Sequence, residues 1–290
     1  MSYAIQIENL SKSYGKNTAI QDIHLNIEEG TIFGFIGPNG AGKSTTIKCM
    51  MNLIRSNTGE VCIQGKPLSK NREAIREIMG YLPSEIHLYE DLTVKKMLDY
   101  AASFYKKDCS KRRKQLVDKL EVEEDKKIDE LSLGNLKKVG IVIAFMHEPK
   151  IVIMDEATSG LDPLMQEKFY EILLEEKKKK TTIFFSSHIL SEVKRICDNI
   201  AIIKDGKIVK VERIQDLQET NMVKVKIVAQ HIEELEKALA VPVLEKKDNQ
   251  IQFIYTGDID QLLKIVSQYT VSKFLVEELD IEEIFMHYYQ

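Results

Sequence analysis

The chain has 290 residues, of which 43% are hydrophobic and 30% charged, a composition typical of folded globular proteins and not of disordered ones. This length allows about two domains, each with a sizeable core. Its 41 basic and 45 acidic residues give a net charge of −4 and an isoelectric point near 6.0, so we expect no nucleic-acid partner.

The sequence shows no sign of a membrane-spanning or secretory segment. Its longest apolar run, Val139–Met146, has eight residues, whereas about 20 are needed to cross a bilayer. The N-terminal residues lack a basic segment followed by an apolar one, so we expect no signal peptide. The four cysteines are scattered without a CxxC pair, which argues against zinc or a disulfide framework and favours a reducing cytosol.

A strand predicted over Thr31–Gly37 leads directly into a glycine-rich loop and then a helical pattern. The loop matches the phosphate-binding pattern G-x-x-x-x-G-K-[ST], with Lys43 placed to neutralise phosphate charge and Ser44 to offer Mg²⁺ a hydroxyl oxygen. Its glycines let successive backbone N–H groups point at phosphate oxygens. The alternative is a glycine-rich turn that matches by chance. The loop consists of Gly37, Pro38, Asn39, Gly40, Ala41, Gly42, Lys43, Ser44 and Thr45.

Residues 93–146 are predicted to be mainly helical. Apolar side chains recur there at three- and four-residue spacing, which predicts a helix with one buried face. The predicted face carries Val94, Met97, Leu98, Ala101, Phe104 and Tyr105.

A second buried strand, Ile151–Asp155, ends in the pair Asp155–Glu156. A carboxylate at the end of such a strand beside the phosphate loop suits Asp155 to a Mg²⁺-bound water, and Glu156 to polarising an attacking water. The alternative is an acidic strand end that caps the next helix. The occurrence of the loop in the same chain favours the functional interpretation.

Two more apolar strands, Thr182–Ser187 and Asn199–Lys204, follow at spacings that predict a parallel α/β sheet with helices between the strands. His188 comes directly after the first of them. By itself, a histidine at a strand end is more often solvated or hydrogen-bonded than catalytic.

The last part of the chain, residues 221–290, has seven basic and twelve acidic residues and a different pattern. Alternating apolar residues and short helical stretches predict the order β-α-β-β-α-β-α, a small ferredoxin-like α+β domain. Asp258 is predicted to cap one helix, and Asp280–Tyr288 to form the last one. We therefore divide the chain into domains at 1–220 and 221–290.

Taken together, these motifs resemble an ATP-binding cassette (ABC) ATPase over residues 1–215. Two further segments match the family. LSLGN (Leu131–Asn135) corresponds to its signature segment, and SGLD (Ser159–Asp162) is the second match. The resemblance implies a P-loop α/β fold with a helical subdomain at about residues 90–147. The most similar members are single-cassette subunits of bacterial multidrug and peptide-antibiotic exporters.

The resemblance also implies roles for individual residues. Tyr14 matches the aromatic residue that stacks on adenine. Ser132 and Gly134 match the signature positions that close over the γ-phosphate held by an opposite cassette. Asp162 matches the segment at the dimer interface, and His188 the histidine that senses the γ-phosphate.

The chain departs from the family pattern at four positions. Leu133 and Asn135 replace a glycine and a glutamine of the signature, and Ala157 replaces a common proline, which we expect to matter little. Leu133 adds a β-carbon where the backbone is often tight. Ser84 replaces a glutamine that reaches Mg²⁺ and the attacking water. Its hydroxyl is a possible Mg²⁺ ligand on a shorter side chain, which leaves a bridging water, participation of Glu85, or an altered response to the partner as alternatives.

We therefore expect a Mg²⁺-dependent ATPase that dimerises with a second cassette, in the simplest case its own copy, and drives a separate integral membrane permease. It would act in the cytoplasm, peripherally on the inner face of the cell membrane. One alternative, a soluble regulatory ABC ATPase, is disfavoured by the single phosphate loop and the lack of heptad repeats. Another, a cassette that binds ATP as a structural clamp and hydrolyses it slowly, is suggested by Ser84 and Leu133.

Overall fold

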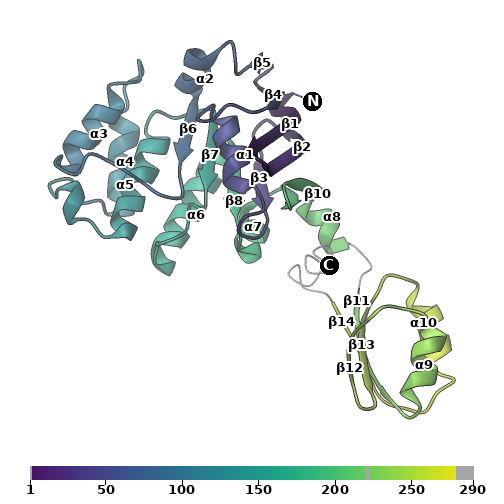
Figure 1. Ribbon diagram of the computed structural model, residues 1–290. Coiled ribbons are helices and arrows are strands. Elements are labelled where there is room, and N and C mark those ends of the chain that lie inside the picture. Colours follow the sequence, from purple (N-terminus) through teal and green to yellow (C-terminus); the bar gives the residue numbers. More distant parts are fainter. Residues whose placement is uncertain (1, 220–222, 279–290) are drawn as a thin grey trace. The chain divides into compact units, whose positions relative to one another are not determined.

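The computed structural model describes residues 2–219 and 223–278 (Figure 1). Contacts within the chain divide it into two compact units, Met1–Ile214 and Gln215–Gln290. Within the described residues, no helix combines the length and the apolar character needed to span a membrane.

The larger unit is built on a six-stranded sheet with the order β10-β9-β3-β8-β7-β6 (Figure 1). Five strands are parallel and β10 is antiparallel. All residues of the central strands β3, β7 and β8 are buried, as expected for strands covered on both faces by other elements. This confirms the α/β prediction. The strands are β3 (Ile32–Ile36), β6 (Met79–Leu82), β7 (Ile151–Asp155), β8 (Thr182–Ser187), β9 (Asn199–Lys204) and β10 (Lys207–Arg213).

A second, antiparallel sheet that the sequence analysis did not predict has the order β2-β1-β4-β5. Its side chains form one hydrophobic core with β3 and with α1 (Lys43–Met50), and Ile5, Phe35 and Ile47 are fully buried in that core. The sheet therefore supports the helix that follows the phosphate loop. It comprises β1 (Tyr3–Tyr14), β2 (Asn17–Glu28), β4 (Thr58–Ile63) and β5 (Lys66–Pro67), and α2 (Arg72–Ile78) follows it.

The predicted helical region begins at α3 (Val94–Ala102), where the Thr93 hydroxyl accepts a hydrogen bond from the Lys96 amide. Four of the six predicted face residues are buried in α3, but Phe104 is 66% exposed, so that part of the prediction is wrong. The helix ends before Phe104, whose ring packs edge-on against Tyr100 at the surface. The remaining helices of the unit are α4 (Ser110–Leu120), a 3₁₀ turn (Ile128–Glu130), α5 (Leu133–Phe145), α6 (Pro163–Lys178) and α7 (Leu190–Ile196), and α8 (Ile214–Glu219) begins at its last residue.

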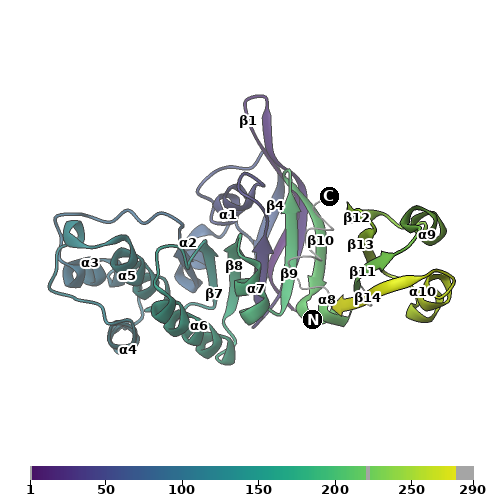
Figure 2. The same cartoon turned by 90° about the horizontal axis from the view of Figure 1, so that it is seen from below.

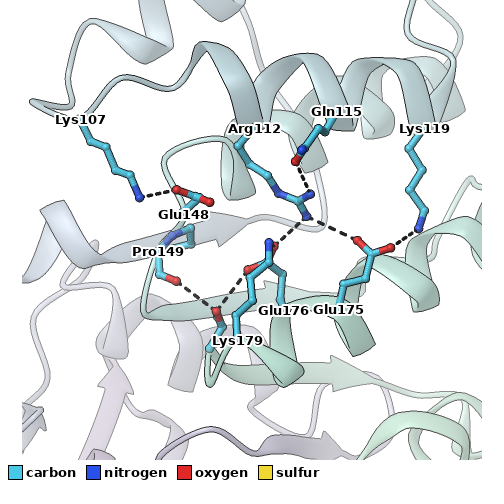
Figure 3. Close-up of polar contacts among 10 residues, drawn as sticks. Lys107, Arg112, Gln115, Lys119, Glu148, Pro149, Glu175, Glu176 and Lys179 are labelled. Atoms are coloured by element: carbon cyan, nitrogen blue, oxygen red, sulfur yellow. Dashed lines mark hydrogen bonds and ion pairs between the residues drawn. The ribbon is translucent and has the colours of Figure 1, made fainter.

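A buried ion-pair network fastens α4 to α6 (Figure 3). Nη2 of Arg112 lies 2.7 Å from Oε1 of Glu176, and these side chains are 8% and 1% exposed. Glu176 also accepts hydrogen bonds from Lys179 and Thr181, while Lys119 binds Glu175 at the rim. The helical region is thus held to the sheet-based core by charges that are largely removed from water.

The smaller unit has the element order β-α-β-β-α-β, which confirms the prediction up to residue 278. Its sheet is antiparallel, with the order β12-β13-β11-β14, and Val225, Leu235, Phe253 and Leu262 are fully buried in its core. Asp258 caps the second helix as predicted. The predicted helix Asp280–Tyr288 lies outside the described residues. The elements are β11 (Val223–Ala229), α9 (Ile232–Leu239), β12 (Val243–Lys247), β13 (Gln250–Tyr255), α10 (Ile259–Val266) and β14 (Val271–Glu278).

Candidate functional site

The loop Gly37–Thr45 connects β3 to the first turn of α1, as the sequence pattern requires. Gly42 has a φ of 106°, and a β-carbon there would lie 2.7 Å from the carbonyl oxygen of Ala19. A β-carbon at Gly37 would lie 2.4 Å from the carbonyl oxygen of Ile203. Side chains are therefore excluded at both positions, and the loop presents its backbone at the N-terminus of α1, where N–H groups lack acceptors within the helix.

Lys43, the first residue of α1, is buried beneath this loop with a side chain that is 5% exposed. Its ammonium group donates hydrogen bonds to the carbonyl oxygens of Gly37 at 2.8 Å and Pro38 at 3.1 Å. Burial lowers the pKa of Lys43, and the nearby carboxylates of Glu156 and Asp155 oppose that shift. The charge is thus held at the inner side of the loop by both the backbone and the acidic pair.

Asp155 is the last residue of β7 and is 2% exposed. Its Oδ1 accepts a hydrogen bond of 3.1 Å from the hydroxyl of Ser186 on the neighbouring strand β8. Burial, with a further contribution from the Asp155 charge, raises the pKa of Tyr81 to about 12. Ser186, which no sequence pattern indicated, thus fixes the orientation of the predicted metal-binding carboxylate.

Glu156 follows in a left-handed backbone conformation, with a φ of 48°. Its amide donates a hydrogen bond to the carbonyl oxygen of Ser186 at 3.1 Å, which helps hold this costly conformation for a residue with a side chain. As a result, Oε1 of Glu156 lies 3.8 Å from Nζ of Lys43 and 3.3 Å from Nδ1 of His188.

The structure therefore brings together four predicted residues, Lys43, Asp155, Glu156 and His188. They come from the ends of β7 and β8 and the start of α1, since the carboxyl ends of parallel strands meet at one edge of the sheet. A buried cation, a loop of backbone N–H groups and a partly exposed carboxylate are the groups required to bind a polyphosphate and to activate water beside it.

The predicted signature segment lies at the start of α5, on the far side of β6 and β7 from α1 (Figures 1 and 2). Ser132 caps this helix, and its hydroxyl accepts a hydrogen bond from the Asn135 amide at 3.3 Å. Asp162 caps α6 by accepting one from the Met165 amide at 3.0 Å. Both side chains are exposed, and no hydrogen bond among the described residues joins either one to the loop Gly37–Thr45.

The expected effect of Leu133 on closure over a second cassette stays a prediction, and within the chain its side chain is 81% exposed. The tight position is the next residue. A β-carbon on Gly134 would lie 2.7 Å from the carbonyl oxygen of Gly160, in the segment between β7 and α6. The first turn of α5 thus packs directly on the segment that follows Glu156.

Ser84 lies in the exposed loop after β6, and its expected role at Mg²⁺ stays a prediction. Its carbonyl oxygen accepts a 3.0 Å hydrogen bond from Nζ of Lys137, a buried lysine of α5 that the sequence analysis did not single out. Burial lowers the pKa of Lys137, and Asp155 and Glu156 oppose the shift. The Glu85 carboxylate is 87% exposed and lies 3.7 Å from the His87 ring.

Tyr14 ends β1, in a hairpin that projects from the antiparallel sheet (Figure 2). The ring is 51% exposed, and the Lys12 ammonium lies 5.2 Å from its centroid. No hydrogen bond or ring contact in the described ranges joins Tyr14 to the phosphate loop. An exposed ring beside the sheet remains free to stack on a planar ligand.

Comparison with known proteins agrees with this geometry. A family model described as ABC transporter matches residues 20–159. The linearmycin resistance ATP-binding protein LnrL of Bacillus subtilis is 34% identical over 218 residues, which are 73% of this chain and 70% of that protein. This chain belongs to the ABC transporter ATP-binding proteins. The bacitracin transport ATP-binding protein BcrA of Bacillus licheniformis is 32% identical over 76% of this chain and 73% of its own length.

Solved structures of ABC ATPases share the fold. The ATP-binding subunit of an ABC transporter superimposes with a TM-score of 0.71 at 32% identity, over 74% of this chain and 92% of that one. CbiO1 of Clostridium perfringens, part of the transporter complex cbiONQ, gives 0.64 at 27% identity over 75% and 91% of the two chains. The dimeric cassette MJ0796 gives 0.67 at 25% identity over 72% and 98%. The chain is therefore the ATP-hydrolysing subunit of an ABC transporter, and the larger unit is its cassette.

Proposed function

We propose that this ABC ATPase hydrolyses ATP at the edge of the sheet where the phosphate loop meets the ends of β7 and β8. The loop Gly37–Thr45 binds the phosphates through its backbone N–H groups, and Lys43 neutralises charge on the β- and γ-phosphates. Glu156 accepts a hydrogen bond from the attacking water and polarises it, while His188 contacts the γ-phosphate. The observation that carries this assignment is the position of Glu156 Oε1 between Lys43 and His188, 3.8 Å and 3.3 Å away.

The residues present suit Mg²⁺. Ser44 on α1 offers a hydroxyl oxygen, Asp155 a buried carboxylate, and both are hard oxygen ligands. No group of three or more acidic, histidine or cysteine side chains within residues 2–219 and 223–278 is arranged to hold a metal alone. We therefore assign Mg²⁺ binding to Ser44 and Asp155 together with ATP oxygens, and propose the Ser84 hydroxyl as a further ligand. When bound, the ion neutralises phosphate charge.

A second cassette, in the simplest case a second copy of this chain, completes the site. Ser132 and Gly134 lie at an exposed helix start away from the chain's own loop, which suits them to the nucleotide of a partner. Asp162 caps the helix start next to them and belongs to the same interface, and Tyr14 stacks on adenine. The dimeric form of the similar cassette MJ0796 supports this arrangement.

The membrane partner is an integral permease, and the ATPase docks peripherally on the inner face of the cell membrane. CbiO1 belongs to a multi-subunit transporter complex, which supports a separate partner chain. The linearmycin resistance and bacitracin transport proteins among the relatives favour export of an antibiotic, peptide or drug. The same relatives favour a transporter role over a soluble regulatory one.

The test is an affinity purification of this chain from detergent-solubilised membranes, with and without ATP, read by mass spectrometry. The K43A variant, which lacks the proposed phosphate contact, is the matched control for ATP-dependent association. We expect recovery of one polytopic membrane protein in stoichiometric amount, whose sequence would narrow the substrate. Recovery of a soluble complex without a membrane protein would contradict the proposal.

A further inference from the structure

A lysine on the signature helix contacts the loop that carries Ser84. Lys137 lies on α5, just over one turn after Ser132, and its side chain is 3% exposed. Its ammonium group donates hydrogen bonds to two carbonyl oxygens of the loop after β6, that of Pro83 at 3.2 Å and that of Ser84 at 3.0 Å. One charged group therefore satisfies two acceptors on a different element, 53 and 54 residues away in the sequence.

The same end of α5 touches a second part of the catalytic site. Gly134 approaches the carbonyl oxygen of Gly160 so closely that a β-carbon would lie 2.7 Å from it, and Gly160 is four residues beyond Glu156. Ser84, Leu133, Lys137 and Gly160 also line a common cavity of about 430 Å³. The start of α5 thus joins the loop after β6 to the segment after β7.

Because residue 84 is a serine, the position of its hydroxyl depends on the loop backbone that Lys137 contacts. The serine side chain is short, so the hydroxyl can lie near the acidic strand end only where the backbone of the loop holds it. Ser84 is an exposed residue, and its backbone carbonyl oxygen is bonded to Lys137. The ammonium group also lies close enough to Asp155 and Glu156 to interact with both charges.

We propose that Lys137 is a positioning residue that clamps the Pro83–Ser84 backbone to the signature helix. The clamp fixes where the backbone of the loop holds Ser84. Its effect on turnover rests on the proposed ATPase function, whereas the clamp itself is a property of the single chain.

The test compares K137M, which retains an unbranched side chain without a donor, with K137R, which retains charge and donors. The control K138M alters the next lysine of the same helix, which is only half-buried and whose side chain makes no hydrogen bond among the described residues. Amide hydrogen exchange of residues 84–88 is measured on the full chain without nucleotide. In K137M the carbonyl oxygens of Pro83 and Ser84 lose their hydrogen bonds, and the loop should therefore open more often. ATP affinity, kcat and KM are measured in parallel.

We expect K137M to speed exchange at residues 84–88 by about tenfold or more and to lower kcat by a similar factor, with ATP affinity within about twofold of wild type. K137R should recover at least half of the lost exchange protection and of the lost kcat. K138M should match wild type in both measurements. If K137M does not fold by circular dichroism, K137Q serves instead, because its shorter amide cannot reach both carbonyls.

Unchanged exchange at residues 84–88 in the folded variant would overturn the proposal, as would an equal effect in K138M. A loss confined to ATP affinity, with kcat preserved, would also overturn it. Absence of ATP hydrolysis in the wild-type chain would instead contradict the proposed function, while the exchange comparison would still decide the clamp.

Discussion

Arg112 and Glu176 form an ion pair in which Nη2 lies 2.7 Å from Oε1, with both side chains removed from water. The pair joins α4 of the helical region to α6, the helix that starts at Asp162. Figure 3 shows the network around this pair. Glu176 lies in the last turn of α6, at the opposite end of that helix from Asp162, so the pair fastens α4 to α6 well away from the catalytic strand ends.

Removing one member of this pair should destabilise the chain. R112M removes the buried partner of Glu176 and leaves Lys179 as its cation, so we expect a loss of about 1–3 kcal/mol in the free energy of unfolding. The double variant R112M/E176M should recover part of that loss, because the buried carboxylate that lost its buried partner is then gone as well. Urea titration followed by circular dichroism measures both. K106M removes an exposed ion pair with Glu77 and should leave the midpoint nearly unchanged; a comparable effect there would contradict this account.

Lys43 should be required for nucleotide binding. K43A removes the cation beneath the phosphate loop, so we expect ATP affinity to fall by at least about tenfold and ATP turnover to be lost. Isothermal titration calorimetry measures the affinity. The control is K48A, an exposed lysine on the same helix. Wild-type affinity in K43A would refute the assignment of the loop.

Glu156 should affect chemistry more than binding. E156Q keeps the size of the side chain and loses the negative charge that polarises water, so we expect kcat to fall by about 10²–10⁴-fold while ATP affinity changes little. Single-turnover phosphate release provides the measurement. The surface variant E167Q should retain wild-type kcat. Normal phosphate release in E156Q would remove Glu156 from the mechanism, and slow release already in the wild type would favour the structural-clamp alternative.

His147 should make stability depend on pH. Its ring is 3% exposed and stacks on Tyr105 at 3.8 Å, and burial lowers the pKa of His147 to about 4. The unfolded chain binds this proton near pH 6.5 and the folded chain only near pH 4, so stability is lost as the pH falls through that window.

The loss attributable to His147 should reach about 3 kcal/mol at pH 4. It is obtained by comparing the pH dependence of unfolding in wild type and in H147Q, which retains a donor for the Met79 carbonyl oxygen. The variant should have the shallower dependence between pH 6.5 and 4. Parallel curves would show that the histidine is not buried in its neutral form.

Local sequence patterns predicted the features that depend on local geometry. The glycine-rich loop, the apolar strand before it and the acidic pair at the end of β7 each combine residue type with immediate context, and all were placed correctly in the fold. The antiparallel sheet was missed because strands such as β1 and β4 pair across about 50 residues, and their register depends on partners that no short window contains.

The supporting contacts of the site were missed for a similar reason. Ser186 and Lys137 are ordinary residues in their own segments and acquire a role only through partners on other elements. Phe104 was placed on a buried face because a periodic pattern does not mark where the helix ends. The exposure of Leu133 likewise depends on the start of α5 lying at the surface.

The left-handed backbone of Glu156 has a consequence for the stability of this enzyme. For a residue with a β-carbon that conformation costs ~1–2 kcal/mol of free energy, whereas glycine adopts it without this cost. A Glu156→Gly chain would avoid that cost, but it would lose the carboxylate beside the buried Lys43 and the group that the proposed reaction needs. The strained backbone is therefore the cost of placing a carboxylate between Lys43 and His188.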